Sequence, residues 1–449
     1  MSRSREAASV GEPRTFPSRL GRFTLLSELG AGGMATVYLG KDALAEGIER
    51  LVAIKTIHAQ LADQDAFVDM FLDEARIATL INHPNVCSVL DFGRADGAYF
   101  MAMEYLVGEP LSEVIRQVWE HRLHDPVLEA LPFLAARIVA DACEGLHAAH
   151  ETAGVGGQRL EVVHRDVSPQ NLFVTYEGTV KVVDFGCAKA VQRITETSAG
   201  IFKGKLAYAA PEQLQIRKLD ARTDVWALGA VLWETLTLER IFKRDSPMQT
   251  ARAILEEPIP RVDEVDPYLP RELGDIVARA LTRDPNGRWQ SAREMGRALR
   301  GFIAGAGANF ESAETADWMG YLFRERRHAR IRAAADAEAT LASHVAPTSS
   351  LTHEPFGDEL PTMEAPLEDD EESEAEAPMP LSRPKLAAAA RPVEDRSLDE
   401  GRPSTVSLRL DAEDRAEGPA RRGGGSGWIV GLLATGLVAA AFAAWLYLS

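Results

Sequence analysis

Apolar side chains recur along residues 21–302 with the spacing of short strands near the start and of helices further on, which predicts one large folded domain. Leu25–Leu29 and Thr36–Leu39 have the composition of two strands flanking a glycine-rich turn. Residues 67–80 repeat apolar positions at helical spacing, and residues 138–146 hold the positions of a buried helix. The pattern therefore predicts an α+β domain.

The segments on either side of this domain have other patterns. Residues 1–20 are polar, and we expect them to be disordered. Residues 303–345 are predicted to form a helical extension, because Trp318, Leu322 and Phe323 lie on or near one helix face. A basic cluster follows, which is either the solvated face of a packing helix, the interpretation we favour, or a contact with anionic lipid. It consists of Arg324, Arg326, Arg327, Arg330 and Arg332.

Charge and hydropathy separate two further segments. Residues 346–427 hold 19 acidic and nine basic residues with frequent Pro, Ser and Ala, which predicts a disordered linker. A solvated spacer is the default interpretation, and a partner-binding acidic tail is the alternative. Residues 428–448 contain no charged side chain and would span roughly 31 Å as a helix, the thickness of a hydrocarbon core. We favour a transmembrane helix over a buried core helix, because glycines flank it.

The charge around the predicted span indicates its orientation. Arg421 and Arg422 precede it and no basic residue follows, so the folded domain is expected in the cytoplasm of a single-pass protein of the inner membrane.

Composition excludes several classes of function. The net charge of −18 argues against generalised nucleic-acid binding. Cys87, Cys143 and Cys187 lack CxxC spacing, so neither a disulfide framework nor a zinc site is indicated. Cys187 is interpreted as a buried filler in preference to a reactive thiol, and His121 and His124 as surface loop residues.

A glycine-rich turn and a lysine make a candidate phosphate site. Residues 30–35 read Gly-Ala-Gly-Gly-Met-Ala, and glycines let backbone N–H groups close over phosphate oxygens. Lys55 ends a strand, and Glu74 lies on the apolar face of the helix at residues 67–80. A carboxylate there needs a partner, and Lys55 is the economical choice. A purely structural ion pair remains the alternative.

Two short strands at residues 172–183 predict a cation site. Asn171 precedes the first strand and Asp184 follows the second, so antiparallel pairing brings both to one end. Their oxygens suit Mg²⁺ with phosphate ligands. Asp166 lies beside this site and is the natural acceptor of a hydroxyl proton. A second Asp-Phe-Gly, at residues 91–93, is distant from this loop and is given a turn or strand-end role.

These motifs resemble those of protein kinases. The resemblance covers about residues 23–302, and with its glycine loop and span it is most similar to bacterial transmembrane serine/threonine kinases. It implies a two-lobed protein kinase fold, with a small antiparallel-sheet N-lobe and a mainly helical C-lobe around ATP and Mg²⁺. It also rests on His83-Pro84-Asn85, Met103-Glu104-Tyr105-Leu106, Ala210-Pro211-Glu212, Asp224-Val225-Trp226 and Arg288.

The resemblance implies roles for individual residues. Asp166 would be the base, Lys55 with Glu74 would hold the α and β phosphates, and Asn171 and Asp184 would bind Mg²⁺. Glu212 and Arg288 would form a structural bridge. The residues expected around ATP are Leu29, Gly30, Ala31, Gly32, Gly33, Met34, Ala35, Thr36, Val37, Ala53, Lys55, Met103, Glu104, Leu106 and Phe173.

Three residues depart from the family pattern. Ala35 replaces a third glycine, Ser168 stands where a lysine is usual, and Lys205 stands where a threonine is usual. The roles of the usual lysine and the usual threonine look exchanged between these two positions. Lys205 is therefore predicted as a catalytic cation, and the Ser168 hydroxyl as its hydrogen-bond partner. The alternative is that Lys205 points to solvent.

The predicted activity is transfer of the ATP γ-phosphoryl group to serine and threonine hydroxyls of proteins. The alternatives are a pseudokinase and a small-molecule phosphotransferase. Residues 186–212 resemble the activation segment of protein kinases, which argues against a small-molecule phosphotransferase. Thr195, Thr197 and Ser198 are candidate autophosphorylation sites whose charge would pair with Arg165. Tethering to a membrane would favour self-association for this step. Because Ser449 follows the span directly, no external sensor domain is expected.

Overall fold

The computed structural model describes residues 16–43, 49–121, 125–154, 156–185, 205–308 and 310–332, with side chains in the third range from residue 128. Within these ranges, no helix is long and apolar enough to cross a membrane. The predicted linker and span lie outside the described residues.

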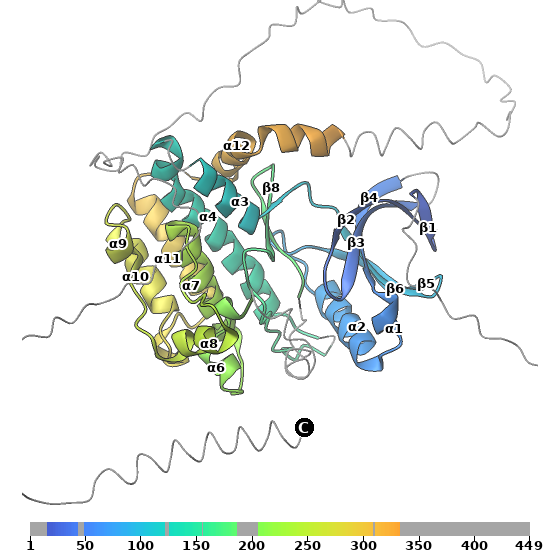
Figure 1. The fold of residues 1–449 in the computed structure, drawn as a ribbon, viewed down its shortest axis with the longest axis horizontal. Helices are drawn as coiled ribbons and strands as arrows, with labels where there is room; N and C mark the ends of the chain where they lie inside the picture. Colours follow the sequence, from blue (N-terminus) through green and yellow to red (C-terminus); the bar gives the residue numbers. More distant parts are fainter. Residues whose placement is uncertain are drawn as a thin grey trace, which may run out of the picture. The chain divides into compact units, whose positions relative to one another are not determined.

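A six-stranded antiparallel sheet forms the N-terminal lobe (Figure 1), in the order β1-β2-β3-β4-β6-β5. Alternation along β4 places Val52 and Ile54 in one apolar cluster, while Lys55 and Ile57 face the other side. Two helices, α1 (Ala59–Ala62) and α2 (Asp65–Thr79), follow β4 in the same lobe. The strands are β1 (Ser18–Leu20), β2 (Phe23–Ala31), β3 (Ala35–Ala43), β4 (Glu49–Ile57), β5 (Val89–Ala95) and β6 (Ala98–Glu104).

A second, three-stranded sheet joins this lobe to the next. The chain leaves β6 and forms β7 (Gly108–Pro110), which pairs with β8 (Leu172–Thr175), and β8 pairs with β9 (Val180–Val182). The β8–β9 hairpin is the predicted pair of strands. Its open end carries Asn171 and Asp184.

Helices build the C-terminal lobe around α4 (Asp125–His150) and α7 (Ala221–Thr237), which pack together in the main apolar core. Asp220 caps α7, since its side chain accepts a hydrogen bond from the Arg222 N–H, and Trp226 is fully buried. The other helices are α3 (Leu111–Glu120), α6 (Pro211–Leu214), α8 (Pro247–Glu256), α9 (Val262–Val265), α10 (Arg271–Ala280), α11 (Ala292–Gly305) and α12 (Ser312–Leu322), with 3₁₀ turns η3 (Lys205–Tyr208) and η4 (Pro285–Gly287).

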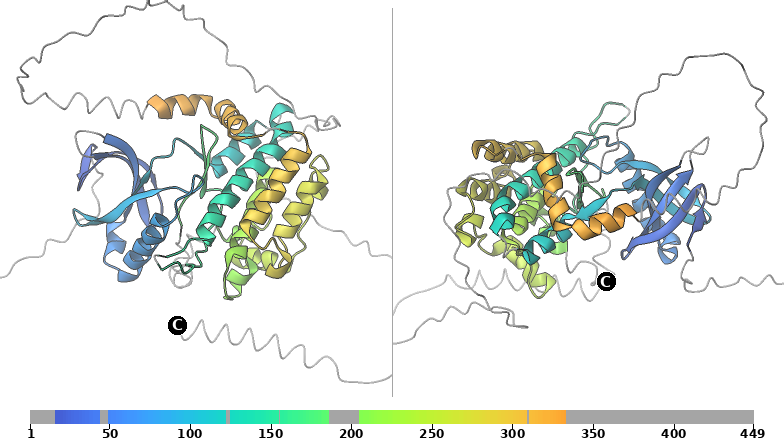
Figure 2. Two further views of the ribbon diagram at one scale, coloured as in Figure 1. Left: turned by 180° about the vertical axis from the view of Figure 1, so that it is seen from behind. Right: turned by 90° about the horizontal axis from the view of Figure 1, so that it is seen from above.

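The two-lobed α+β architecture is the predicted one, and two local features differ from expectation. Residues 1–20 were expected to be disordered, but Ser18–Leu20 forms β1. This strand is ordered because it pairs with β2 and because Leu20 is buried against the sheet. The single helical pattern after Glu311 is interrupted: α12 ends at Leu322, Phe323 turns, and residues 324–332 are helical again. Both views in Figure 2 show this C-terminal segment lying along the C-terminal lobe and running toward the N-terminal lobe.

Candidate active site

Lys55 connects the two lobes at the centre of the site. Its Nζ lies 2.8 Å from Glu74 Oε1 on α2 and 2.9 Å from Asp184 Oδ1 after β9. Glu74 is buried on the apolar face of α2, as its spacing predicted, and therefore needs a cation. The ammonium of Lys55 lowers the pKa of Asp184 below its ordinary value. One lysine thus orients a carboxylate from each lobe.

Asp166 and Asn171 lie side by side in the loop that leads into β8. The Asn171 side-chain amide donates to the Asp166 carbonyl at 2.8 Å and to Asp166 Oδ2 at 2.9 Å. The Val183 N–H donates to the Asn171 carbonyl, which closes the open end of the hairpin and places Asn171 near Asp184 as antiparallel pairing predicted. Since the amide nitrogen of Asn171 is used, its oxygen remains for a cation.

Asp224 at the start of α7 fixes the backbone of this loop. Its carboxylate accepts 2.8 Å hydrogen bonds from the N–H groups of His164 and Arg165, and it lies 2.7 Å from His150 Nε2. Burial acts to raise the pKa of Asp224, but the hydrogen bonds from His150 and from the Arg165 N–H act in the opposite direction, and this pKa lies below its ordinary value. His150 was not among the predicted site residues, because its position at the end of α4 gives no signal beyond an apolar helix pattern.

Two non-glycine residues of the site have left-handed backbone conformations. Arg165 has φ 66° and Asp184 has φ 59°. Such conformations cost energy and persist where surrounding contacts hold them, commonly at functional sites. Asp224 supplies such a contact to Arg165, and Lys55 supplies one to Asp184.

Lys205, at the first position of η3, points to Asp166. Its Nζ lies 2.5 Å from Asp166 Oδ2, although the side chain is 44% exposed. The predicted partner Ser168 differs from expectation: its hydroxyl is buried and has no hydrogen-bond partner among the described residues. The expected Ser168 hydrogen bond is therefore wrong, while Lys205 lies beside Asp166 and does not point to solvent.

A cavity of about 760 Å³ joins these groups to the glycine-rich turn. The turn is tighter than expected, because β2 runs to Ala31 and β3 begins at Ala35. A Cβ on Gly30 would meet no atom within 4 Å, which leaves open space beside the backbone. The predicted residues that line the cavity are Leu29, Gly30, Ala31, Gly32, Gly33, Met34, Ala35, Val37, Lys55, Glu74, Asp166, Asn171, Asp184 and Lys205.

The predicted adenine-side residues do not line this cavity. Thr36, Ala53, Met103, Glu104, Leu106 and Phe173 are absent from its wall. Strand register nevertheless places Ala53 and Met103 opposite each other on the sheet face of Lys55. Glu104 turns its side chain away to accept hydrogen bonds from Lys181 Nζ and the Ser88 N–H. The Glu104 N–H also donates to the Ser88 carbonyl, so the Glu104 carbonyl oxygen is the group left for a ligand.

The cavity also has an apolar end, whose residues were not among the predicted site residues. Leu61 of α1 and three residues of α2, Phe67, Met70 and Phe71, form this wall. The helical repeat at residues 67–80 was the available signal, but periodicity alone does not separate core positions from pocket positions.

The residues present suit a nucleotide with Mg²⁺. A volume near 760 Å³ lies in the range of ligand sites, and Lys55 and Lys205 supply cations on its wall. Among the described residues, no group of three or more His, Cys, Asp or Glu could hold a metal by itself. Asn171 and Asp184 offer two oxygen ligands, which fits an ion that completes its coordination with phosphate and water.

Other predicted positions have the following outcomes. Asp91 lies within β5, and its carboxylate bonds Arg22 and the Phe92 N–H, far from the catalytic loop. His121 lies in the turn directly after α3, partly exposed, and its ring contacts Tyr321 of α12. His124, Cys187, Thr195, Thr197 and Ser198 lie outside the described residues.

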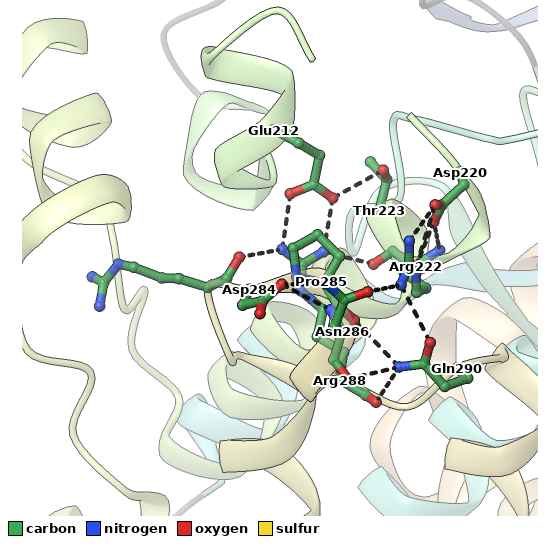
Figure 3. A network of polar contacts seen from close by, with 10 residues as sticks. Glu212, Asp220, Arg222, Thr223, Asp284, Pro285, Asn286, Arg288 and Gln290 are labelled. Carbon is green, nitrogen blue, oxygen red and sulfur yellow. Dashed lines mark hydrogen bonds and ion pairs between the residues drawn. The ribbon is translucent and has the colours of Figure 1, made fainter. Parts of the chain in front are cut away.

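Glu212 and Arg288 form the expected bridge in the C-terminal lobe (Figure 3). Arg288 Nη1 and Nη2 contact the two Glu212 oxygens at 2.7 and 2.8 Å, and Thr223 donates to the same carboxylate. The remaining Arg288 donors bond backbone carbonyls of Thr282, Arg222 and Arg283. The bridge anchors the segment after Ala210-Pro211 to α7 and η4.

The fold and the site together have the layout of a phosphoryl-transfer enzyme. A cavity between the lobes is lined by two lysines, Lys55 and Lys205, and by side chains that could bind a metal ion or a proton. These side chains are Asp166, Asn171 and Asp184. A model of the protein kinase domain matches residues 23–298, more than half of the chain, and the chain belongs to this family.

Curated relatives carry several kinase names. The tyrosine-protein kinase MasK of Myxococcus xanthus is 41% identical over 284 residues, covering 63% of this chain and 43% of that protein. The serine/threonine-protein kinases PknB of Mycobacterium tuberculosis and PrkC of Bacillus subtilis are 35% and 32% identical, covering 63% and 61% of this chain and 43% and 39% of those proteins. The chain spans less than half the length of each of these relatives.

Among solved structures, the kinase domain of PknI from Mycobacterium tuberculosis is similar. It is 24% identical with a TM-score of 0.47, and the match covers 65% of this chain and 99% of that one.

Proposed function

We propose that this chain is a serine/threonine protein kinase that transfers the γ-phosphoryl group of ATP to protein hydroxyls. The observation that carries the proposal is the convergence of Lys55, Glu74 and Asp184 with Asp166 and Asn171 around one cavity. Each of these side chains has a charge or a lone pair that phosphoryl transfer uses. A pseudokinase, which only binds a ligand or a partner, would not require all five of these side chains around the cavity.

The chemistry follows from what each residue holds. Lys55 would bind the phosphates, with Glu74 and Asp184 fixing its ammonium. Asn171 and Asp184 would hold Mg²⁺, which when bound neutralises charge on the phosphates. Asp166 would orient the substrate hydroxyl and accept its proton at a carboxylate oxygen. The contact with Asn171 keeps Asp166 oriented for this role.

The identity of the acceptor residue is the finer part of the proposal. Two of the three relatives are named serine/threonine kinases and one is named a tyrosine kinase. Incubation of the full chain with radiolabelled ATP, Mg²⁺ and a mixed protein substrate, followed by phosphoamino-acid analysis, tests it. Label on phosphoserine and phosphothreonine is expected. Label on phosphotyrosine alone would make the chain a tyrosine kinase. If the wild type incorporated no more phosphate than Asp166→Asn, a pseudokinase would be favoured.

Lys205 is proposed as a second catalytic cation. Its ammonium touches Asp166, where the transferred phosphoryl group and the hydroxyl would meet. A unit charge about 4 Å from a phosphate oxygen is worth on the order of 4 kcal/mol at an effective dielectric near 20, so its loss could cost on the order of a thousandfold in rate.

The variants Lys205→Thr and Ser168→Ala separate this role from a structural one. The first should be severely impaired, and the second should resemble the wild type because the Ser168 hydroxyl has no described partner. Ser168→Lys combined with Lys205→Thr should recover much of the rate if a cation from either side suffices. Wild-type turnover of Lys205→Thr would show that Lys205 has no catalytic role.

Autophosphorylation and membrane tethering are two further parts of the proposal. Thr195, Thr197 or Ser198 would accept phosphate between neighbouring copies, and residues 428–448 would anchor the chain. Phosphosite mapping of the active enzyme tests the first part, and unmodified residues at all three positions would contradict it. Fractionation of cells tests the second, since a chain without residues 428–449 should become soluble. Its continued presence in membranes would show a different anchor.

A further inference from the structure

The helical segment at residues 310–332 lies beyond the residues that match the protein kinase domain, yet it packs closely on the lobe. Five of its large apolar residues are buried in the main core, and α12 contacts α3 and β8. Figure 1 shows the segment crossing this side of the C-terminal lobe toward the N-terminal lobe. The buried residues are Phe310, Trp318, Met319, Leu322 and Phe323.

The start of α12 rests on the turn of the β8–β9 hairpin. Gly178 in this turn has φ 80°, and a Cβ there would lie 1.8 Å from the Ser312 carbonyl oxygen and 2.8 Å from the Ala316 nitrogen. No side chain fits between the two elements. Arg137 of α4 holds the same end of α12, since it donates to the Phe310 carbonyl and to the Ser312 hydroxyl. The turn is the opposite end of the hairpin that carries Asn171 and Asp184.

The later part of the segment is tied to the connection between the lobes by charge. Glu109 in β7 is 1% exposed and follows shortly after the residues expected beside adenine. Its carboxylate accepts a hydrogen bond from the Tyr176 hydroxyl at 2.8 Å and lies 3.0 Å from Arg330 Nη2. Arg326 lies 3.7 Å from Glu109 and 2.9 Å from Glu113 of α3. Within the described part of the chain, these two arginines are the ion-pair partners of Glu109.

A buried carboxylate that loses its cations is left uncompensated, so the position of β7 depends on the docked arginines. Glu109 lies in β7, and Tyr176 directly follows β8. The two strands pair with each other, and the Tyr176 hydroxyl donates to Glu109. The arginines therefore act on both the interlobe connection and the hairpin that presents the metal ligands.

We propose that residues 310–332 form a brace that positions the nucleotide and metal side of the cleft, with Glu109, Arg326 and Arg330 as positioning residues. The proposal rests on the proposed function in that it takes ATP as the ligand of the cleft. It adds that an element outside the matched kinase domain sets the affinity for this ligand.

The test compares two double variants of the full chain that remove equal charge from one helix. Arg326→Ala with Arg330→Ala removes both partners of Glu109, whereas Arg324→Ala with Arg332→Ala removes two arginines that make no contact with Glu109 or Glu113. The first pair should raise the KM for ATP about three- to tenfold, the scale of coupling between linked sites, with kcat nearly unchanged. The second pair should leave both constants at wild-type values.

Amide hydrogen exchange supplies a readout that does not need activity. In the Arg326 and Arg330 variant, the peptides that contain Gly108–Pro110 and Leu172–Val182 should exchange faster, and in the control they should not. A wild type that neither binds nor turns over ATP would contradict the proposed function while leaving this exchange test in force.

Three outcomes would overturn the brace: an unchanged KM for ATP with unchanged exchange in a folded variant, an equal change in the control, or a fall in kcat alone. If the double variant does not fold, Arg330→Ala against Arg330→Lys makes the same comparison. Lysine keeps the charge, so the KM of Arg330→Lys for ATP should lie near the wild-type value, whereas Arg330→Ala should raise it.

Discussion

Two clusters of ion pairs in this molecule contrast in what surrounds them. Around Lys55, the carboxylate of Asp184 is 39% exposed, and the Lys205 side chain that contacts Asp166 is 44% exposed. In the bridge of Arg288 and Glu212, the arginine is 0% exposed and its guanidinium meets two carboxylate oxygens and three backbone carbonyls.

The difference indicates two uses of charge. The bridge has its donors used within the protein, so its geometry is fixed when the chain folds. The pairs of Asp184 with Lys55 and of Lys205 with Asp166 sit on the wall of a cavity and each has an accessible member, so a phosphate or a metal ion could replace that partner at little cost in stability. Charge in the bridge therefore serves folding, and charge in the cleft serves binding and chemistry.

The largest effect expected from this contrast is on activity in the cleft. Asp166→Asn removes the proton acceptor while keeping a side chain of the same shape, so turnover should fall by about 10² to 10⁴. The unfolding free energy should stay near that of the wild type, because the ion-pair partner of Asp166, Lys205, is 44% exposed and an asparagine oxygen can still accept the hydrogen bond from Asn171. Phosphate incorporation and urea unfolding of the same preparation measure the two quantities.

Asp275→Asn is a matched control, since Asp275 is an exposed aspartate paired with Arg261 far from the cleft. It should alter neither quantity. Near-normal turnover of Asp166→Asn would mean that the base lies elsewhere.

The second effect is on stability in the bridge. Arg288→Ala leaves the Glu212 carboxylate buried without its cation, which should cost about 3 to 5 kcal/mol of unfolding free energy. Arg252→Ala breaks the exposed pair with Glu256 and should cost at most about 1 kcal/mol. Urea unfolding at neutral pH compares the two. Equal losses would contradict the distinction between a buried bridge and an accessible pair.

Sequence reasoning located the chemistry of the cleft better than its shape. Helical spacing placed Glu74 on an apolar face, and the hairpin rule brought Asn171 to Asp184, because both arguments use local periodicity or strand pairing. His150 reaches Asp224 across 74 residues, a contact that no local pattern encodes.

The same limit applies to the rest of the fold. The contact of Gly178 with Ser312 and the pairing of Arg330 with Glu109 depend on how α12 docks, which spacing alone cannot give. The hydrogen bond expected of Ser168 is wrong because such a contact depends on a side-chain direction, which spacing alone does not give, and this hydroxyl has no partner among the described residues.

The smallest effect concerns the pH dependence of the cleft pair. Lys55 lowers the pKa of Asp184 in the folded chain, so this carboxylate adds stability that is fully present above its unfolded pKa, about 3.9. That stability is lost as the pH falls through the lower, folded pKa. Because Asp184 is 39% exposed, solvent screening limits the contribution to about 0.2 to 1 kcal/mol.

Asp184→Asn should therefore be less stable than the wild type by this small amount at neutral pH, and the two unfolding free energies should converge in acid. Urea unfolding of both proteins, at pH values from neutral to below the folded pKa of Asp184, measures the difference. The loss caused by Arg288→Ala, measured alongside, should not show this convergence through Asp184, because the bridge does not contact the cleft pair. A difference between wild type and Asp184→Asn that grows in acid would mean that the pKa of Asp184 is raised, and Lys55 would then not be the cation that governs this carboxylate.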